Sequence, residues 1–277
     1  MAARRTILVT GCSSGIGAHC ARRLLEEGWR VFATARKKED IEVLQEAGLD
    51  AVYLDYREPE SIKACFDEVM TKTGGRLDAL FNNGAYAQTG AVEDLPIAAL
   101  REQFDANFFG WHELTLYAIA AMREQGSGRI VQHSSVLGFV PASWRGAYNA
   151  SKYALEGLYT TMGMELENSN IHVSLIETGP IASNLARNAI PYVEKYIDVE
   201  NSVHLQAYNK RLAQLKSGGT PETKSNSPEL VYKQLRRALN DKTPRRHYFV
   251  TIPTHISGLM RRALPFGLLY KVLRRWS

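Results

Sequence analysis

The sequence contains little cysteine and no long apolar segment. Its three cysteines are too few for a disulfide framework and lack the spacing of a zinc site, so we predict no metal-binding residues. No run of about 18 apolar residues is present, and we therefore expect no membrane-spanning helix. The N-terminal segment carries basic residues but lacks the apolar core of a signal peptide. These absences together favour a cytoplasmic protein.

Acidic residues are missing from the C-terminal part of the chain. Residues 242–277 contain eight Lys or Arg and no Asp or Glu, so the rest of the chain carries a net charge of −3 although the total is +5. A nucleic-acid-binding protein more often spreads basic residues over a broad face, so we expect no nucleic-acid partner. Residues 255–277 form a basic, amphipathic tail. This pattern suits either an interfacial helix on anionic lipid or docking onto an acidic protein surface, and both interpretations remain open.

Short apolar, β-branched runs alternate with amphipathic stretches along most of the chain. The helical stretches show apolar stripes such as Leu100, Phe104, Phe108 and Trp111, while the strands are nearly continuously apolar, as expected when both faces of a sheet are covered. We predict an α/β fold: one Rossmann-like, doubly wound domain over residues 1–277, with helices on both faces of a parallel sheet of about seven strands. The predicted strands are residues 7–10, 30–34, 51–54, 79–82, 129–133, 172–176 and 248–252.

A glycine-rich motif, TGCSSGIG at residues 10–17, follows the first predicted strand and opens the first predicted helix. Glycines let the backbone turn tightly and approach a pyrophosphate, while the helix N-terminus offers free N–H groups to the anion. The alternative is a plain turn between strand and helix. The residues of this motif that we predict to bind a dinucleotide are Gly11, Ser13, Ser14, Gly15, Ile16 and Gly17.

The end of the second predicted strand carries no carboxylate. Sites specific for NAD place an acid there to hold the ribose 2′-hydroxyl, whereas this sequence has Arg36 followed by two lysines. Arginine is suited to bidentate binding of a phosphate. We therefore predict that NADP, as NADPH, is the preferred cofactor and that Arg36 contacts its 2′-phosphate, with NAD as the alternative. A solvated cluster of charges would have the same sequence pattern.

Tyr148 and Lys152 lie four residues apart in a predicted helix, so both side chains point to the same side. A tyrosine with an ordinary pKa of about 10 is a poor base near neutrality. A nearby ammonium favours the phenolate and lowers that pKa. The pair could thus act as an acid/base unit that interconverts a hydroxyl and a carbonyl, although such a pair alone is usually just part of a helix surface.

Taken together, the motifs make the chain resemble the short-chain dehydrogenase/reductase family over almost its whole length. TGCSSGIG is similar to the family's dinucleotide motif, and NNGA at residues 82–85 resembles its NNAG motif with glycine and alanine exchanged. Other residues stand in the family's order. The matches are Asp55 to the acid that contacts adenine, and Asn107, Ser135, Tyr148 and Lys152 to the catalytic tetrad.

The resemblance implies a role for each residue of the tetrad. Tyr148 would be the acid/base, and Ser135 would orient and polarise the substrate oxygen. Lys152 would hold the ribose hydroxyls and lower the pKa of Tyr148. Asn107 would anchor a water that links Lys152 to solvent. The neighbouring Ser134 would point to the other side of an extended strand, and His133 is interpreted as a packed side chain.

Two further segments bear on cofactor and substrate. The turn TGPI at residues 178–181 resembles the branch that holds 17-beta-hydroxysteroid and retinol dehydrogenases, and it makes Ile181 a predicted cofactor contact together with Asn82. Residues 181–227 form a predicted insert that covers the substrate. Their apolar side chains could close over a cleft or could simply pack two helices on the domain.

The sequence thus predicts an NADP(H)-dependent oxidoreductase that acts on a lipophilic carbonyl or alcohol, such as an aldehyde, retinoid or steroid. The resemblance implies a homodimer or homotetramer. Two alternatives remain: an NAD-dependent alcohol dehydrogenase that works in the oxidative direction, and a regulator that binds a dinucleotide without catalysis.

Overall fold

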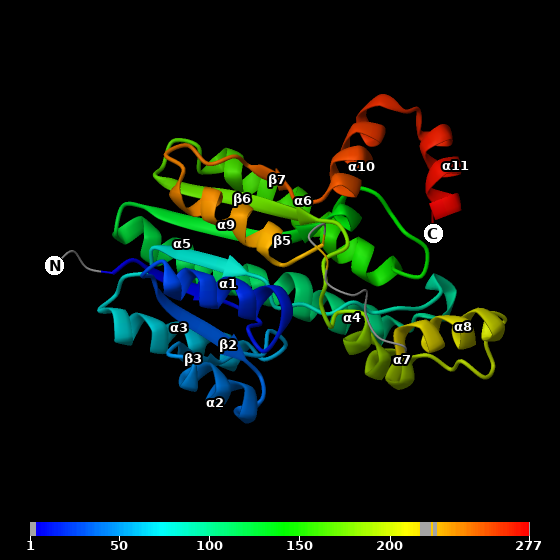
Figure 1. Ribbon diagram of the computed structural model, residues 1–277, viewed down its shortest axis with the longest axis horizontal. Coiled ribbons are helices and arrows are strands. Elements are labelled where there is room, and N and C mark those ends of the chain that lie inside the picture. Colours follow the sequence, from blue (N-terminus) through cyan, green and yellow to red (C-terminus); the bar gives the residue numbers. More distant parts are fainter. Residues whose placement is uncertain (1–3, 217–222, 224–225, 277) are drawn as a thin grey trace.

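Seven parallel strands form one sheet in the order β3-β2-β1-β4-β5-β6-β7 in the computed structural model, which describes residues 4–216, 223 and 226–276 (Figure 1). The predicted α/β fold and its sheet are confirmed. All seven predicted strands are present, with ends that differ by a few residues. Their bounds are β1 (Thr6–Val9), β2 (Arg30–Ala35), β3 (Asp50–Tyr53), β4 (Ala79–Asn82), β5 (Gly128–Ser135), β6 (Ile171–Thr178) and β7 (His247–Phe249).

Helices cover both faces of the sheet, because successive side chains of a buried strand point to opposite faces. In β1, Ile7 and Val9 pack in one apolar cluster with α1 and α9, whereas Leu8 packs in another with α3, α5 and α6. All three side chains are fully buried. The bounds of the helices in these layers are α1 (Gly15–Glu26), α2 (Lys38–Glu46), α3 (Pro59–Thr73), α4 (Ile97–Phe104), α5 (Gly110–Glu124), α6 (Gly146–Glu165) and α9 (Glu229–Asn240).

The strand order reverses between β1 and β4, which lie side by side at the centre of the sheet. In an open parallel sheet, the loops at the carboxyl ends of such strands diverge and leave a crevice for a ligand. The loop after β1 carries the glycine-rich motif, and the loop after β4 carries Asn83. The fold therefore places both segments at the same edge of the sheet.

The predicted insert, residues 181–227, forms α7 (Ile190–Tyr196) and α8 (Leu205–Lys216), and residues 217–222, 224 and 225 of it lie outside the described residues. Val193, Ile197 and Tyr208 are buried in a small apolar cluster that also includes Leu95 and Trp144. The two helices therefore pack on the loops beyond the carboxyl edge of the sheet. The remaining short turns are η1 (Val92–Asp94), η2 (Asp105–Phe109), η3 (Val136–Gly138) and η4 (Arg187–Ala189).

The basic tail forms two helices, α10 (Ile252–Ala263) and α11 (Phe266–Trp276), which stand out from the body of the molecule as an arm (Figure 1). Within the described residues, no helix has the length and apolar character needed to cross a membrane.

Candidate active site

A cleft of about 1110 Å³, open solvent included, lies at the carboxyl ends of the central strands. Its walls come from the glycine-rich turn, the ends of β2 to β5, helix α6 and the start of the insert. Of the predicted site residues, those that line it are Gly11, Ser13, Ser14, Gly15, Ile16, Arg36, Asp55, Tyr148 and Lys152. Gly17, Asn82, Asn107, Ser135 and Ile181 are not among its lining residues.

The glycine-rich turn brings the backbone close to the cleft. Gly11 and Gly15 have φ angles of 68° and 58°, which L side chains rarely adopt. Ser14 begins α1 without a side-chain cap, so the first N–H groups of the helix remain available to an anion. Gly17 packs against the turn: a Cβ atom there would lie 2.2 Å from the carbonyl oxygen of Gly11. This geometry fits the pyrophosphate of a dinucleotide.

We expect Gly17→Ala to lower the melting temperature and weaken dinucleotide binding, because the added methyl group collides with backbone that cannot move without opening the turn. Overpacking of this kind costs about 1–3 kcal/mol. Gly157→Ala, in α6, is the matched control, since nothing lies within 4 Å of the added Cβ. It should leave stability unchanged or raise it by about 0.5–1 kcal/mol. Equal melting temperatures for both variants would contradict the proposed role of Gly17.

At one end of the cleft, Arg36 and Asp55 face each other. The Arg36 side chain is 54% exposed and lies 3.8 Å from the Asp55 carboxylate. Asp55 is buried and is held by Arg57, whose Nη2 donates to Oδ2 at 2.5 Å. Burial opposes ionisation of Asp55, but hydrogen bonds and charge from Arg57, together with the charge of Arg36, lower its pKa overall. Arg36 is therefore a weakly held cation at the cleft, and Arg57 is a neighbour that the sequence analysis missed.

The two asparagines after β4 differ in position. Asn82 is fully buried beneath the cleft, where it donates to the Thr115 hydroxyl at 3.0 Å and accepts from the Tyr56 hydroxyl at 2.6 Å. Asn83 lines the cleft, and its Nδ2 donates to the carbonyl oxygen of Thr10 at 2.9 Å. Asn83 thereby ties the loop after β4 to the glycine-rich turn. The sequence analysis named Asn82 alone, although the NN pair pointed to both.

Lys152 and Tyr148 project from α6 beside the end of β5. Lys152 is fully buried, and its Nζ donates to the carbonyl oxygen of His133 at 2.7 Å and lies 4.3 Å from the centre of the Trp111 ring. Burial lowers the pKa of Lys152 to about 7. Burial raises the pKa of Tyr148, while the hydroxyl of Ser135 and the positive charge of Arg145 act in the opposite direction. The side chain of Arg145 was not identified from the sequence.

Ser135 and Ser134 face opposite sides of β5, as expected for an extended strand. The Ser135 hydroxyl lies beside Tyr148 and accepts a hydrogen bond from the N–H of Leu137 at 3.1 Å. The Ser134 hydroxyl lies beside Glu156, although Ser134 also contributes to the wall of the cleft. Of the two serines, Ser135 is therefore the one placed to act with Tyr148.

Asn107 lies in η2, a π-helical turn between α4 and α5. Its side chain is fully buried and holds the loop after β4, since Nδ2 donates to the carbonyl oxygen of Tyr86 at 2.8 Å and Oδ1 accepts from the N–H of Tyr86 at 3.2 Å. Wide turns of this type are often found at functional sites.

His133 bridges two neighbours through its ring nitrogens. Nδ1 lies 2.8 Å from Asn83 Oδ1, and Nε2 lies 3.2 Å from the hydroxyl of Thr178. Burial and the charge of Lys152 lower the pKa of His133 to about 3. The imidazole is thus neutral near pH 7 and packs between strands, in agreement with its interpretation from the sequence.

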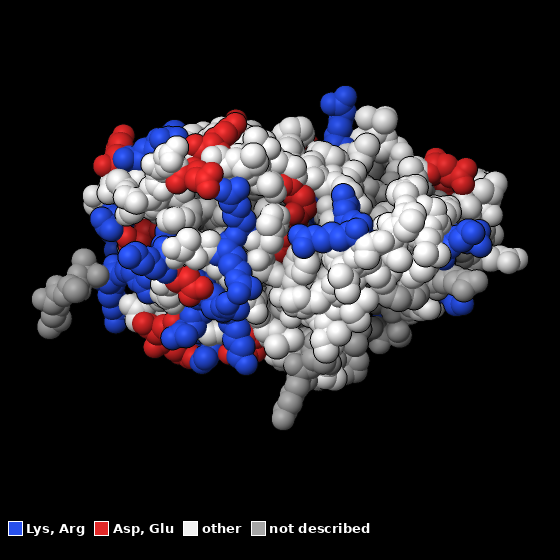
Figure 2. All heavy atoms as spheres, turned by 90° about the horizontal axis from the view of Figure 1, so that it is seen from above, with Lys and Arg blue, Asp and Glu red and all other residues white. Residues whose placement is uncertain are grey.

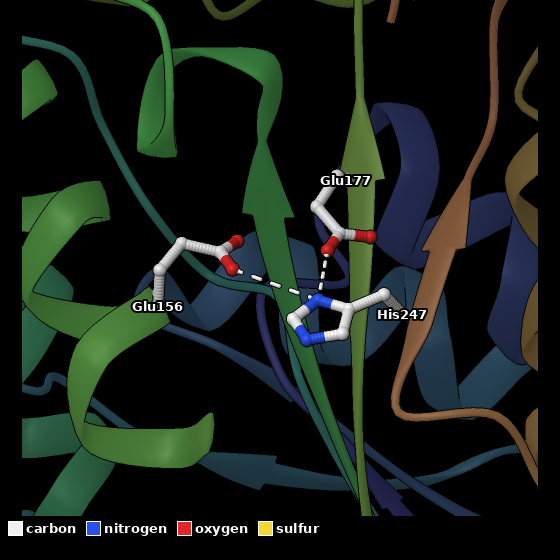
Figure 3. Close-up of side chains that lie close together, drawn as sticks. All are labelled: Glu156, Glu177 and His247. Atoms are coloured by element: carbon white, nitrogen blue, oxygen red, sulfur yellow. Dashed lines mark hydrogen bonds and ion pairs between the residues drawn. The ribbon is translucent and has the colours of Figure 1, made fainter. Parts of the chain in front are cut away.

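Glu156, Glu177 and His247 form a cluster one helical turn beyond Lys152 (Figure 3). His247 Nδ1 lies 2.5 Å from the nearly inaccessible Glu177 carboxylate and 3.8 Å from that of Glu156. Burial and the charge of Glu177 raise the pKa of Glu156 to about 7, and the hydrogen bond to Glu177 raises the pKa of His247. The sequence analysis did not identify this cluster because its members lie far apart along the chain.

We expect Glu156→Gln to match the parent protein at pH 5 and to melt at a higher temperature at pH 8. The folded-state pKa of Glu156 is raised above its ordinary value of 4.5. Stabilisation from the protonated carboxyl is therefore complete below pH 4.5 and is lost as the pH rises through about 7. Glutamine keeps the neutral form, and we expect a gain of about 2–4 °C at pH 8, equivalent to about 1 kcal/mol.

Thermal melts at the two pH values measure this effect. Glu165→Gln, at an exposed position on the same helix, is the matched control. Its melting temperature should equal that of the parent protein at both pH 5 and pH 8. A gain at pH 8 that also appeared at pH 5, or no gain at all, would contradict the raised pKa of Glu156.

Comparison with known proteins gives relatives along the whole chain. A family model described as short chain dehydrogenase matches residues 5–192. The chain is 36% identical to the uncharacterized oxidoreductase YbbO of Escherichia coli over 98% of its own length and 94% of that protein. It is 35% identical to human retinol dehydrogenase 8, over 66% of this chain and 60% of that protein. It is 31% identical to human 17-beta-hydroxysteroid dehydrogenase type 1, over 90% of this chain and 78% of that protein.

A solved structure agrees with these matches. The crystal structure of a short-chain dehydrogenase from Streptomyces avermitilis superimposes with a TM-score of 0.77 and 26% identity, covering 99% of this chain and 96% of that one. The family resemblance inferred from the motifs is confirmed, including the likeness to hydroxysteroid and retinol dehydrogenases. The chain belongs to the short-chain dehydrogenase/reductase family and is an NAD(P)-dependent oxidoreductase.

Proposed function

We propose that the protein is an NADP(H)-dependent oxidoreductase that interconverts a carbonyl and an alcohol on a lipophilic substrate. The observation that carries this proposal is the composition of one cleft. Arg36 stands at one end, the glycine-rich turn in the middle, and Tyr148 with Lys152 at the other end. NADP(H) needs a cation for its 2′-phosphate and an anion-binding turn for its pyrophosphate. The substrate beside its nicotinamide ring needs an acid/base, and the cleft offers all three groups.

The tetrad residues have separate proposed roles. The bound nicotinamide cofactor supplies or accepts the hydride, which is chemistry that no side chain provides. Tyr148 gives a proton to the substrate oxygen during reduction and takes it back during oxidation. Ser135, beside the Tyr148 hydroxyl, holds the substrate oxygen. Lys152 binds the ribose hydroxyls, and Asn107 anchors a water between Lys152 and solvent.

Burial raises the pKa of Tyr148, and the polar groups beside it offset part of this effect. A positive charge near a phenol stabilises its ionised form, and here the half-buried Arg145 supplies such a charge. A Lys152 pKa of about 7 means that this amine exchanges its proton readily at neutral pH. Lys152 is therefore suited to restore the proton of Tyr148 after each turnover.

The preference for NADP(H) rests on the end of β2. The strand ends at Ala35, and the next acidic residue along the chain is Glu39, in α2. No carboxylate from this strand end is thus available to the ribose 2′-hydroxyl, while Arg36 lines the cleft with more than half of its side chain exposed. Asp55 is proposed to contact adenine, and Asn82 and Ile181 are proposed to support cofactor binding.

A lipophilic substrate is supported by apolar and aromatic side chains of the cleft. Tyr86 and Leu185 are among its lining residues, and the Tyr86 ring stacks on Tyr192 of the insert with ring centres 3.9 Å apart. The names of two relatives, a retinol and a hydroxysteroid dehydrogenase, point to the same class of substrate. Residues 181–227 are proposed to cover the bound substrate.

A homodimer or homotetramer is also proposed. Leu116 of α5 and Met164 of α6 are 50% and 58% exposed, although both are large apolar side chains on helices. Paired helices from two subunits would bury them.

Titration with NADPH and NADH, followed by a panel of retinal, decanal, a ketosteroid and small keto acids, tests the proposed function. Tighter binding of NADPH with turnover of the lipophilic carbonyls is expected. Preference for NADH would favour the alternative of an NAD-dependent alcohol dehydrogenase. Turnover of small charged keto acids alone would overturn the proposed substrate class, and tight binding without any turnover would favour a non-catalytic regulator.

A further inference from the structure

Helix α10 is attached to the protein through its polar side. Thr254, Ser257 and Gly258 are its buried residues, and a Cβ atom at Gly258 would lie only 2.5 Å from the Phe249 ring. Small residues at these positions therefore let the helix approach the end of the sheet closely. In an ordinary surface helix, the apolar stripe faces the core and the polar side faces water.

The apolar side of α10 faces outward instead. Ile252, Ile256 and Leu259, at spacings of four and three residues, form one stripe and are 72%, 46% and 69% exposed. In α11, Leu269 is buried whereas Phe266 is 82% exposed. Both helices of the arm thus carry exposed apolar side chains.

Basic side chains accompany this apolar surface. Arg261, Arg262, Lys271 and Arg274 are exposed, and no acidic residue follows Asp241 in the sequence. Figure 2 shows the molecule from above: blue and red side chains are interspersed at the left, whereas the centre and right, where Figure 1 places the arm, are mainly white with a few blue and red side chains. An apolar stripe bordered by cations matches the boundary between lipid headgroups and acyl chains.

We propose that the arm formed by α10 and α11 docks the protein on an anionic lipid bilayer, with Ile252, Ile256, Leu259 and Phe266 inserted and with Arg262 and Arg274 at the headgroups. Charge and the exposed apolar stripe together support this occupant, because an anionic bilayer attracts the exposed cations and also takes up apolar side chains. The proposed contact between two copies of the chain uses a different apolar surface, which includes Leu116 and Met164. This inference goes beyond the proposed reaction and does not depend on the substrate.

The arm is also connected to the active site. α10 packs against η3, the turn that follows Ser135, and Arg261 Nη1 donates to the carbonyl oxygen of Phe139 just beyond it. The Phe139 ring in turn stacks on Phe249 with centres 5.3 Å apart. A bilayer bound to the arm would therefore lie near the segment that supports the catalytic serine.

Vesicle flotation with the full-length protein tests the proposal. We expect the protein to float with vesicles of phosphatidylcholine containing about 30% phosphatidylglycerol, and not with pure phosphatidylcholine. About 0.5 M salt should weaken binding by screening the arginines. The Ile256→Glu/Leu259→Glu variant should lose at least about tenfold in vesicle binding, since two apolar insertions are replaced by charges that anionic lipid repels.

Two further variants separate this effect from damage to the fold. Phe266→Glu, on the other helix of the arm, should also weaken flotation, whereas Val203→Glu, an exposed apolar residue far from the arm in sequence, should behave like the parent protein. All variants should keep the melting temperature, because the replaced side chains are exposed. No flotation of the parent protein, or equal flotation of the arm variants, would overturn the proposal. If the parent protein did not float and the arm variants had a smaller particle mass than the parent, the surface would be a contact between copies. That result would also overturn the proposal.

Discussion

Replacement of Tyr148 by Phe is expected to abolish turnover while leaving binding of the cofactor intact. The phenol is buried next to Ser135 and Arg145, and it is the only group in the proposed mechanism that exchanges a proton with the substrate oxygen. Loss of a positioned acid/base costs about 10²–10⁴ in rate. Stopped-flow or steady-state oxidation of NADPH with an accepted carbonyl measures kcat, and quenching of protein fluorescence by NADPH measures binding.

Tyr153→Phe is the matched control for this experiment. Tyr153 is also in α6, but it lies outside the cleft, with its hydroxyl 3.4 Å from Arg261. The control should keep kcat within about twofold, since an exposed hydrogen bond of this kind contributes little. If Tyr148→Phe kept normal kcat, the proposed acid/base would be wrong. If it lost the cofactor as well, its effect would be structural.

The sheet could be predicted from the sequence because each strand is a continuous apolar run bounded by turns. The ends of two strands could not. β5 and β6 continue to Ser135 and Thr178, where Ser134 pairs with Glu177 and Ser135 with Thr178. These polar residues interrupt the apolar pattern, yet the parallel ladder holds them in extended form. The extension matters for the proposed mechanism because it carries Ser135, the proposed catalytic serine.

The tetrad could be proposed from its motifs, but its surroundings required the structure. The stripe of Leu100, Phe104, Phe108 and Trp111 predicts helix, and it gives no sign of the π-helical turn that turns Asn107 toward Tyr86. Arg145, the residue just before α6, places its positive charge near Tyr148, and no motif marked it. Spacing along one helix can place Tyr148 with Lys152, whereas contacts between distant segments depend on the packing of the whole fold.

The tail shows a different limit of the sequence. Its amphipathic pattern was visible, but the pattern left open whether the tail contacts lipid or an acidic protein surface. Only the structure shows that Gly258 rests on Phe249 and that Leu259 faces outward. The orientation of a helix depends on the shape of the surface on which it packs. The pattern of apolar residues within the helix carries no information about that shape.

Arg36→Ala is expected to weaken NADPH binding by about 10–100-fold and to leave NADH binding nearly unchanged. Hydrogen bonds between charged partners contribute about 1.5–3 kcal/mol, which corresponds to this range of affinity. In the absence of the cofactor, the guanidinium has only a 3.8 Å ion pair with Asp55, so little must be broken before it binds a phosphate. Equilibrium titration of both cofactors, at one fixed ionic strength, measures the ratio of affinities.

Lys38→Ala serves as the control, because Lys38 is two residues away, has an 87% exposed side chain and does not line the cleft. It should change the two affinities equally and by less than about twofold, as expected for a screened surface charge. If Arg36→Ala weakened NADPH and NADH alike, Arg36 would support the adenine end of the site without reading the 2′-phosphate. If the parent protein bound NADPH and NADH with equal affinity, the proposed preference for NADP(H) would lose its basis. The lack of a carboxylate at the end of β2 would then favour neither cofactor. A selective loss of NADPH affinity would instead show that one cation at a strand end determines which reduced cofactor the enzyme uses.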